Sequence, residues 1–384
     1  VASMKDEKLS DQGNEVAWGT IGNASTSEGL FFETLNAAGV LQVPMVISVW
    51  DDGYGISVDN AFQTVKESIS EAMRGMQRTD DKAGIEVIEV EGWNYPALIE
   101  AYTRASELAR SAHVPVLIHV QELTQPLGHS TSGSHERYKS EARLQWEKEY
   151  DCNLTFKNWI LEKKIATEDE LAAIEEKAST AAKEAKTAAW KAYLAPIDEE
   201  RQEAQQLVQA LIANAQDPEP LAPLAVVLSK KNIAYRKPIY AAVRELLWQT
   251  RSNPPPSRKA LQAWWHEKQQ NTQTLYSDKL YNEYDNSTLN VPSIPAKYSV
   301  DASLVDGRVV LRDNFKALLE QHPKLLVFGE DSGKIGDVNQ GLEGLQAIYG
   351  EERVADRGIR EATIIGEGIG MAFRGLRPIA EIQY

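Results

Sequence analysis

Two short polar segments, GNASTSEG and DDGYGIS, carry the residues in this sequence that are best suited to bind a phosphorylated ligand. Gly22 and Ala24 leave room for a ligand to approach the backbone just before a predicted helix, whose free N–H groups and dipole attract phosphate. Asn23 and Asp52 supply oxygen ligands of the kind that Mg²⁺ prefers. On spacing alone, a small-residue turn and an acidic turn that bind nothing are the leading interpretation, because short glycine-containing motifs often occur by chance.

Two further segments place a titratable side chain where it could take part in a reaction. In TQPLGHSTS, His129 is flanked by glycine and hydroxyl residues and could act as a phosphate donor or an acid/base group. A solvent-exposed histidine in a polar loop is the more common alternative. Glu361 opens an apolar helix in RGIREATIIGEGIG, where a favourable charge at a helix N-terminus is an equally good explanation.

An alternation of strand-like and helix-like segments must position the first two motifs. Short apolar, β-branched runs typical of strands buried on both faces alternate with runs of helical spacing, and this order predicts a parallel sheet covered by helices. The strands are expected at 43–50, 84–93 and 114–122, and the helices at 27–41, 59–77 and 95–112. Because ligands bind at the carboxyl edge of such a sheet, Asn23 and Asp52 are expected to lie together there.

The remainder of the chain predicts a helical bridge followed by a second α/β block. An Ala-, Glu- and Lys-rich stretch, 167–195, predicts a long helix that Pro196 interrupts. The alternation resumes after 303. The second block is expected to have helices at 307–321 and 361–374 and strands at 324–330 and 377–384. The predicted fold is therefore α/β, with two domains that each contain a parallel sheet (1–150 and an incomplete 303–384), joined by a helical bridge and linker (151–302).

The bulk properties exclude some partners. The formal net charge is −15 and no basic stripe occurs, which argues against nucleic acid, and no apolar run approaches the roughly 20 residues of a membrane helix. The single cysteine, Cys152, rules out an intrachain disulfide and favours a cytoplasmic location. Because the sequence starts at Val1 and stops at Tyr384 directly after a strand-like run, we expect it to be part of a longer polypeptide.

Taken together and in order, these segments resemble the α and β halves of thiamine-diphosphate-dependent 2-oxoacid dehydrogenases. GNASTSEG with DDGYGIS matches the cofactor motif of the α half, GHSTS matches its cofactor-proximal loop, and GED (329–331) with IREATIIG through GLRPIAEIQ matches the β half. The resemblance implies thiamine diphosphate and Mg²⁺ as cofactors. It also implies that a buried Glu361 carboxyl bonds N1′ of the cofactor's aminopyrimidine, and that His129 touches the diphosphate or the reacting group. The other residues that the resemblance assigns are the metal ligands Asn23, Asp52 and the carbonyl of Tyr54, the diphosphate neighbours Gly22 and Ala24, and the apolar wedge Ile56.

Several positions depart from the family pattern. Asn23 stands where the family has its acidic ligand and Asp52 where it has an asparagine, so one carboxylate is retained and we expect metal binding to survive. Gln125 and Trp50 occupy positions where relatives carry arginine. The diphosphate charge must then be met by the metal, His129, backbone amides or residues outside this sequence.

The resemblance implies oxidative decarboxylation of a small 2-oxo acid, with the branched-chain type favoured. The acyl group would pass to the lipoyl arm of a partner acyltransferase, and Glu361 and His129 would be catalytic. The two halves would be fused in one chain that forms a homo-oligomer, most simply a dimer, and the present piece alone is expected to be inactive. Three alternatives stay open: a pyruvate dehydrogenase type, a transketolase-like enzyme, which should lack the GHSTS and IREATIIG segments together, and a non-catalytic scaffold that retains the fold.

Overall fold

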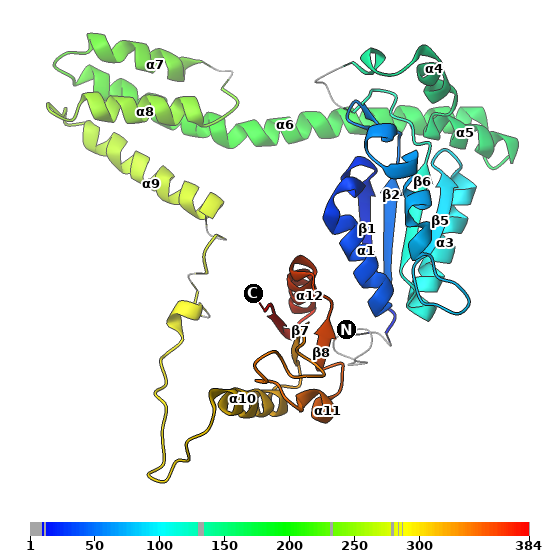
Figure 1. The fold of residues 1–384 in the computed structure, drawn as a ribbon. Coiled ribbons are helices and arrows are strands. Elements are labelled where there is room, and N and C mark those ends of the chain that lie inside the picture. The colour runs from blue at the N-terminus through cyan, green and yellow to red at the C-terminus, as the bar shows by residue number, and fades with distance from the viewer. Residues whose placement is uncertain are drawn as a thin grey trace. The chain divides into compact units, whose positions relative to one another are not determined.

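The chain forms two compact units. The computed structural model describes residue 10 and residues 13–129, 134–230, 233–277, 280–282, 284–285 and 287–383. One unit combines the segment up to Thr167 with the segment from Asp301 onward, and the other comprises Glu168–Val300. Figure 1 labels the elements of both units.

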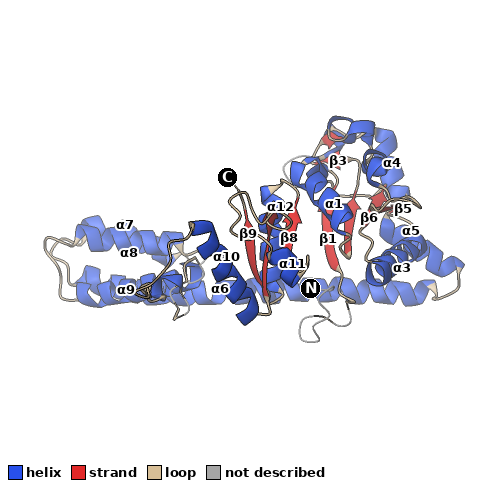
Figure 2. Ribbon diagram, turned by 60° about the horizontal axis from the view of Figure 1, so that its bottom comes forward, coloured by secondary structure: helices blue, strands red, loops and turns tan. Residues whose placement is uncertain are grey.

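The first unit contains a four-stranded, all-parallel sheet of order β1-β2-β6-β5 (Figure 1), and Figure 2 draws the strands in red. Its strands and the helices that pack on them are β1 (Ala17–Gly22), α1 (Gly29–Leu41), β2 (Met45–Trp50), α2 (Ile69–Met73), β5 (Glu86–Glu91), α3 (Tyr95–Ala112) and β6 (Val116–Gln121). The expected strands and the helices around 27–41 and 95–112 are confirmed, and so are the α/β class and the parallel sheets.

The two central strands of this sheet, β2 and β6, are buried on both faces. Alternate residues of a strand point to opposite faces, so Leu117 of β6 packs with α1 and α2, whereas its neighbour Ile118 packs with α3. The α3 side is lined by alanines at four-residue spacing, including Ala105, which lets the helix approach the strands closely. Burial on both faces explains why the central strands β2 and β6 read as largely apolar runs, whereas the edge strand β5 alternates and exposes Glu89 and Glu91.

The expected helix at 59–77 is wrong. This segment contains β4 (Val58–Asp59), which pairs with β3 (Tyr54–Gly55), then three 3₁₀ turns (Asn60–Phe62, Val65–Glu67 and Arg74–Met76) and the five-residue α2. Asp59 and Ser68 turn their side chains back onto nearby backbone N–H groups, which favours caps and turns over a continuous helix. Lys66 and Glu67 also adopt positive φ, which a helix cannot accommodate.

A second parallel sheet, of order β8-β7-β9, lies in the segment after Asp301. Residues of α10 and α11 pack on one side of β7, and α12 packs on the other. The expected elements at 307–321, 324–330, 361–374 and 377–384 are confirmed to within a few residues. The elements are α10 (Gly307–Gln321), β7 (Leu325–Glu330), α11 (Leu345–Tyr349), β8 (Val354–Arg357), α12 (Glu361–Phe373) and β9 (Arg377–Glu381).

The second unit is helical and is built on one long helix, α6 (Glu168–Ala213). The expectation that Pro196 interrupts this helix is wrong, because α6 continues through it. The residues after the proline, such as Ile197 and Leu211, are fully buried against the neighbouring helices, and this burial offsets the hydrogen bond that proline removes. The neighbouring helices are α7 (Ala222–Ser229), α8 (Lys237–Gln249) and α9 (Arg258–Ser277).

Two short helices, α4 (Glu141–Glu149) and α5 (Cys152–Glu162), follow the loop after β6.

None of the helices in the described ranges combines the length and apolar character required to cross a bilayer.

Candidate functional site

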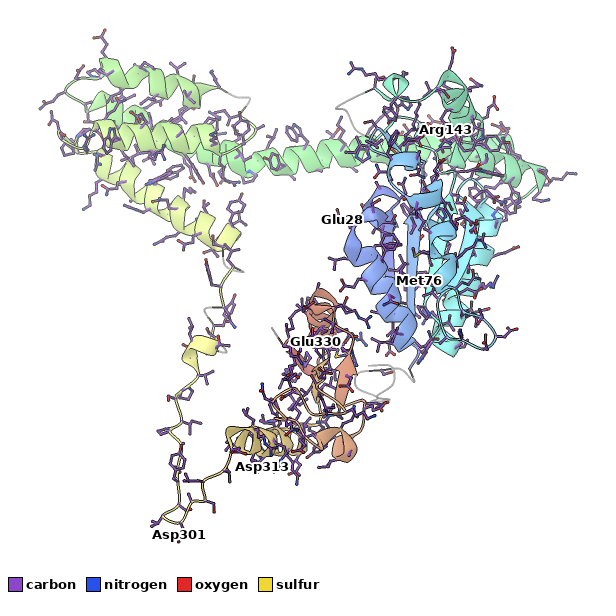
Figure 3. The ribbon with its side chains drawn as sticks, viewed as in Figure 1. Glu28, Met76, Arg143, Asp301, Asp313 and Glu330 are labelled. Atoms are coloured by element: carbon purple, nitrogen blue, oxygen red, sulfur yellow. The ribbon has the colours of Figure 1, made fainter. Side chains whose placement is uncertain are left out.

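A cleft of about 830 Å³ opens at the carboxyl ends of β1 and β2, the edge where parallel sheets place their ligands. Its volume lies within the range of small-molecule and cofactor sites. Figure 3 labels Glu28 at the start of α1, which borders the cleft, and Arg143 on α4. The residues that line the cleft are Thr20, Ile21, Gly22, Asn23, Ala24, Ser25, Glu28, Trp50, Asp52, Tyr54, Gly55, Ile56, Leu123, Thr124, Gln125 and His129.

Asn23 and Asp52 therefore border the same cavity although 28 residues separate them in the sequence. Asn23 is 5% exposed, and its backbone N–H donates to the carbonyl of Trp50 at 3.1 Å, which ties the end of β1 to the end of β2. Its side-chain Nδ2 donates to Oδ1 of Asn60 at 2.8 Å. The Asn23 Oδ1 is then the side-chain atom that remains to serve as a metal ligand.

Asp52 presents the carboxylate of the proposed metal site. It is 9% exposed, and its Oδ1 accepts a hydrogen bond from the backbone N–H of Tyr54 at 3.1 Å. Burial raises the pKa of Asp52 above its usual value, and this rise is only partly opposed by the Tyr54 hydrogen bond and the positive charge of Lys139. A divalent cation against this carboxylate would relieve the cost of its buried charge, so the donor set fits such an ion.

The turn after Asp52 has an unusual backbone. Ile56 adopts φ of 61°, a left-handed conformation that is a genuine outlier for a β-branched residue, and its side chain is exposed at the cleft. Gly55 lets the two loops close on each other, because a Cβ at this position would lie 2.6 Å from that of Ala24. Backbone strain of this kind concentrates at ligand-binding sites.

The part of the cleft beside Gly22 is open to a phosphate group but has little positive charge. A Cβ built on Gly22 would meet no atom within 4 Å, so a ligand can approach the backbone there. Of the residues described as lining the cleft, none is Lys or Arg, and Gln125 and Trp50 both border it. The arginines that the resemblance leads one to expect at positions 125 and 50 are therefore not replaced by another Lys or Arg among the described lining residues.

His129, in the loop after β6, also lines the cleft. The hydroxyl residues that follow it, including Ser130, fall outside the described residues. Gly128 has a positive φ of 70°, and a Cβ there would approach the ring-bearing carbon of His135 at 3.1 Å, so the glycine permits the loop to fold back on itself. His135 does not line the cleft.

A buried ion pair lies beside the loop that carries Asp52 and is connected to it through Arg143. Nζ of Lys139 lies 2.7 and 2.9 Å from the two carboxylate oxygens of Glu147, and both side chains are almost fully buried. Arg143 joins this pair through Glu147 Oε1 at 3.0 Å and also donates to the carbonyl of Asp52 at 3.0 Å. The three side chains fix α4 against the loop that carries Asp52.

A buried polar network that the sequence did not predict centres on Asp51, next to the cleft residue Asp52. Asp51 accepts hydrogen bonds from Asn60, from His119 and from the backbone of Gly53, and these hold the pKa of Asp51 below its usual value although its burial acts in the opposite direction. His119 lies among apolar residues within strand β6, whose other polar residue, Gln121, is at the end of the strand. That isolation was a usable signal, because a buried polar side chain requires a partner.

Glu361 is the one assigned residue outside the cleft lining. It occupies the first position of α12 and is exposed, so the burial expected of its carboxyl is not provided by the described part of this chain. Its position does favour the helix through the dipole. Within the same described residues, no three His, Cys, Asp or Glu side chains form a metal site, so the proposed Mg²⁺ site depends on amide and carbonyl oxygens beside Asp52.

Comparison with known families gives two matches along the chain. Residues 3–197, about half of the sequence, match the family described as dehydrogenase E1 component. Residues 304–384 match the transketolase pyrimidine-binding domain. The cleft lies within the first match and Glu361 lies within the second.

The curated relatives are enzyme subunits. The chain is 45% identical over 74 residues to the pyruvate dehydrogenase E1 component subunit beta of Leifsonia xyli subsp. xyli, covering 19% of this chain and 22% of that protein. It is 50% identical over 66 residues to the subunit of the same name from Acholeplasma laidlawii (17% and 20%), and 46% identical over 74 residues to the 2-oxoisovalerate dehydrogenase subunit beta of Pseudomonas aeruginosa (19% and 21%). The chain thus spans about a fifth of the length of these relatives.

Proposed function

Since this chain belongs to the family of dehydrogenase E1 components, we propose that its cleft binds thiamine diphosphate through Mg²⁺ and that the protein oxidatively decarboxylates a 2-oxo acid. The observation that carries this proposal is the single cavity bordered by seven of the assigned residues: Gly22, Asn23, Ala24, Asp52, Tyr54, Ile56 and His129. When bound, thiamine diphosphate supplies the electron sink that decarboxylation of a 2-oxo acid requires.

The residues of this chain would bind and orient that cofactor. Asn23 Oδ1, the Asp52 carboxylate and the Tyr54 carbonyl would hold the metal, and Gly22 would let the diphosphate reach the backbone. Ile56 would press an apolar side chain against the cofactor, and its strained backbone supports this role. His129 would donate a hydrogen bond to the diphosphate or to the reacting group.

Glu361 would complete the site from the pyrimidine-binding segment by holding a proton near the aminopyrimidine ring. Its exposure in this chain supports a site in which another copy covers it, and we therefore propose a homo-oligomer, most simply a dimer. We also propose that the α-type and β-type halves are fused, because both family matches fall within one chain. A cytoplasmic location forms part of the same proposal.

The acyl acceptor would be a lipoyl domain of a partner acyltransferase. We favour a branched-chain 2-oxo acid as the substrate, and the named relatives include both 2-oxoisovalerate and pyruvate types. Reductive acylation of lipoamide by the full-length protein, measured with a branched-chain 2-oxo acid and with pyruvate in parallel, distinguishes the two. Activity with neither acid, while the cofactor binds, would support a transketolase-like enzyme instead.

The cofactor proposal is tested by calorimetric titration of the protein with thiamine diphosphate in the presence of Mg²⁺ and, separately, of a chelator. We expect saturable binding only with the metal. Absence of binding under both conditions would overturn the proposal and favour a scaffold that retains the fold.

The role of Glu361 is tested by Glu361→Gln in the full-length protein, because the present piece alone is expected to be inactive. We expect this variant to retain metal-dependent cofactor binding within a few-fold and to lose about 10²–10⁴-fold in decarboxylation rate, the range typical of a lost acid/base group. Glu351→Gln, an exposed substitution in the turn before β8, is the matched control. Full activity of Glu361→Gln would remove this residue from the mechanism.

A further inference from the structure

A chain of buried side chains runs from the proposed metal site into the centre of the first sheet. Asn23 donates to Asn60 at 2.8 Å, and Asn60 donates to both carboxylate oxygens of Asp51 at 3.0 and 3.1 Å. Asp51 Oδ2 lies 2.9 Å from Nε2 of His119, whose Nδ1 lies 3.0 Å from Oγ of Ser70. We call these five residues the amide relay.

The chemistry of the relay fixes the orientation of both amides. A carboxylate can only accept hydrogen bonds, so Asn60 must direct its Nδ2 toward Asp51. The Asn60 Oδ1 then faces Asn23 and can only accept, so Asn23 must direct its own Nδ2 toward Asn60. The oxygen of Asn23 is left at the other end of the amide, where the cleft lies.

The far end of the relay holds Asp51 in its acceptor role. The backbone N–H of Ser70 donates to Nδ1 of His119 at 3.4 Å, which assigns the ring proton to Nε2 and makes this nitrogen the donor to Asp51. His119 is 1% exposed and Ser70 is fully buried, so water cannot replace these contacts. Asp51 is also held by the backbone of Gly53 at 2.8 Å.

We propose that Asn60 and Asp51 are positioning residues that keep the Asn23 amide with its oxygen toward the metal. This inference rests on the proposed function, because it gives a role to side chains that do not touch the ion. If the amide were reversed, its NH₂ group would face the cation, and a nitrogen that carries two hydrogens cannot serve as a ligand to Mg²⁺. An asparagine has a single oxygen that can bind the metal, so its amide must be held in one orientation, and the relay holds it. A carboxylate has two equivalent oxygens and needs no such orientation.

The first test compares the Mg²⁺ affinity of variants at saturating thiamine diphosphate by calorimetry. We expect Asn60→Ala to weaken Mg²⁺ binding by about 10–100-fold, the usual effect of losing a group that orients a metal ligand. Asp59→Asn, which removes a charge from the adjacent exposed residue outside the relay, should change the affinity by less than about twofold. If circular dichroism shows that Asn60→Ala is unfolded, the isosteric Asp51→Asn, which no longer fixes the direction of the Asn60 amide, provides the same comparison.

The second test separates orientation from general structural support. In an Asn23→Asp background the ligand is a carboxylate with two equivalent oxygens, which cannot donate to the Asn60 Oδ1 that faces it. Asn60 then has no amide to orient, so adding Asn60→Ala should leave Mg²⁺ affinity unchanged or raise it, and should not lower it. An equal loss in both backgrounds would show that Asn60 acts only on the fold and would overturn the relay. The relay is also overturned if the wild-type protein and Asn60→Ala bind Mg²⁺ and cofactor equally well. Wild-type protein that binds neither overturns the proposed function itself.

Discussion

At the scale of single residues, two adjacent aspartates have opposite environments. Asp51 is surrounded by hydrogen-bond donors, which lower its pKa despite its burial, whereas Asp52 faces the cleft with one backbone donor, and its burial raises its pKa. The first carboxylate is stabilised by the protein, and the second is left to be stabilised by a ligand. A residue whose charge is costly in the free protein is a reasonable metal ligand.

Asp52→Asn is expected to stabilise the metal-free protein at pH 7 while preventing Mg²⁺ binding. A raised pKa means that the folded state disfavours the charged form, so wild-type stability falls as pH rises from the unfolded pKa through the folded one. The amide carries no charge and escapes this loss, so the stability difference should shrink toward acidic pH. We expect Mg²⁺ affinity to fall by more than about 100-fold, beyond the effect of an orienting residue.

Chemical denaturation at several pH values, without metal, measures this effect. Asp59→Asn controls for the loss of one negative charge near the site. An Asp52→Asn variant that is less stable than wild type at pH 7 would show that the carboxylate is already satisfied by the protein.

Ile56→Gly is expected to increase stability at the expense of activity. A non-glycine residue at positive φ costs on the order of 1–3 kcal/mol, and part of this gain is lost to the greater flexibility of glycine in the unfolded chain. We expect the free energy of unfolding to rise by about 1 kcal/mol while cofactor-dependent decarboxylation falls. Ile56→Ala keeps the positive φ and removes most of the side chain, so it separates the effect of backbone strain from that of the side chain. A lower stability of Ile56→Gly than of wild type would argue against strain at this turn.

At the scale of elements, the sequence was sufficient where burial alone determines the structure. Strands such as β2 and β6 are apolar because both faces are covered, so their hydrophobicity predicts them directly. It failed at 59–77, where Asp59 and Ser68 bind the local backbone, a preference that helical spacing does not reveal. It failed again at Pro196, because the burial of the residues beyond it is a tertiary effect.

Pro196→Ala tests the cost of proline within α6. Proline inside a helix removes one backbone hydrogen bond and costs about 3 kcal/mol, so we expect the alanine variant to raise the free energy of unfolding by about 1–3 kcal/mol. Thermal and chemical denaturation followed by circular dichroism measure the change. An alanine variant of lower stability would indicate that the proline ring makes a stabilising contact.

Lys139→Met tests the ion pair beneath the Asp52 loop. Removing one partner leaves Glu147 buried with an uncompensated charge, which typically costs 3–5 kcal/mol. Because Arg143 also contacts Glu147, we expect a loss near the lower end of that range. The double variant Lys139→Met with Glu147→Leu should recover much of the stability; a double variant as unstable as the single one would mean that packing, not charge, is lost.

At the scale of the whole molecule, the sequence identified the cleft residues through resemblance but not the network that supports them. Asn23, Asp52 and His129 belong to motifs whose order along the chain is informative. Asp51, Asn60 and His119 come from three separate segments, and only the folded sheet brings them together. The exposure of Glu361 also depended on the folded chain.

The segment 291–306 has no helix or strand and joins the second unit to the segment that bears Glu361. Tyr298 and Leu304 in it are 84% and 103% exposed, so chymotrypsin should cut there early. We expect the cleaved N-terminal fragment, once separated, to retain metal-dependent cofactor binding and to lack decarboxylation activity. Cleavage that first destroys binding would show that the cleft depends on the segment beyond the cut.

The pairing of Val49 with His119 across β2 and β6 has a consequence for how the sheet assembles. A slip of one residue in β6 would turn the imidazole of His119 to the opposite face and remove one of the three donors that hold Asp51. Such a misaligned chain could still bury apolar side chains, since both faces of the central strands are apolar. It would, however, lose the free energy of binding Mg²⁺ at the proposed site. Binding of Mg²⁺ and thiamine diphosphate would therefore stabilise the sheet with the correct register of β6 relative to sheets with a shifted register.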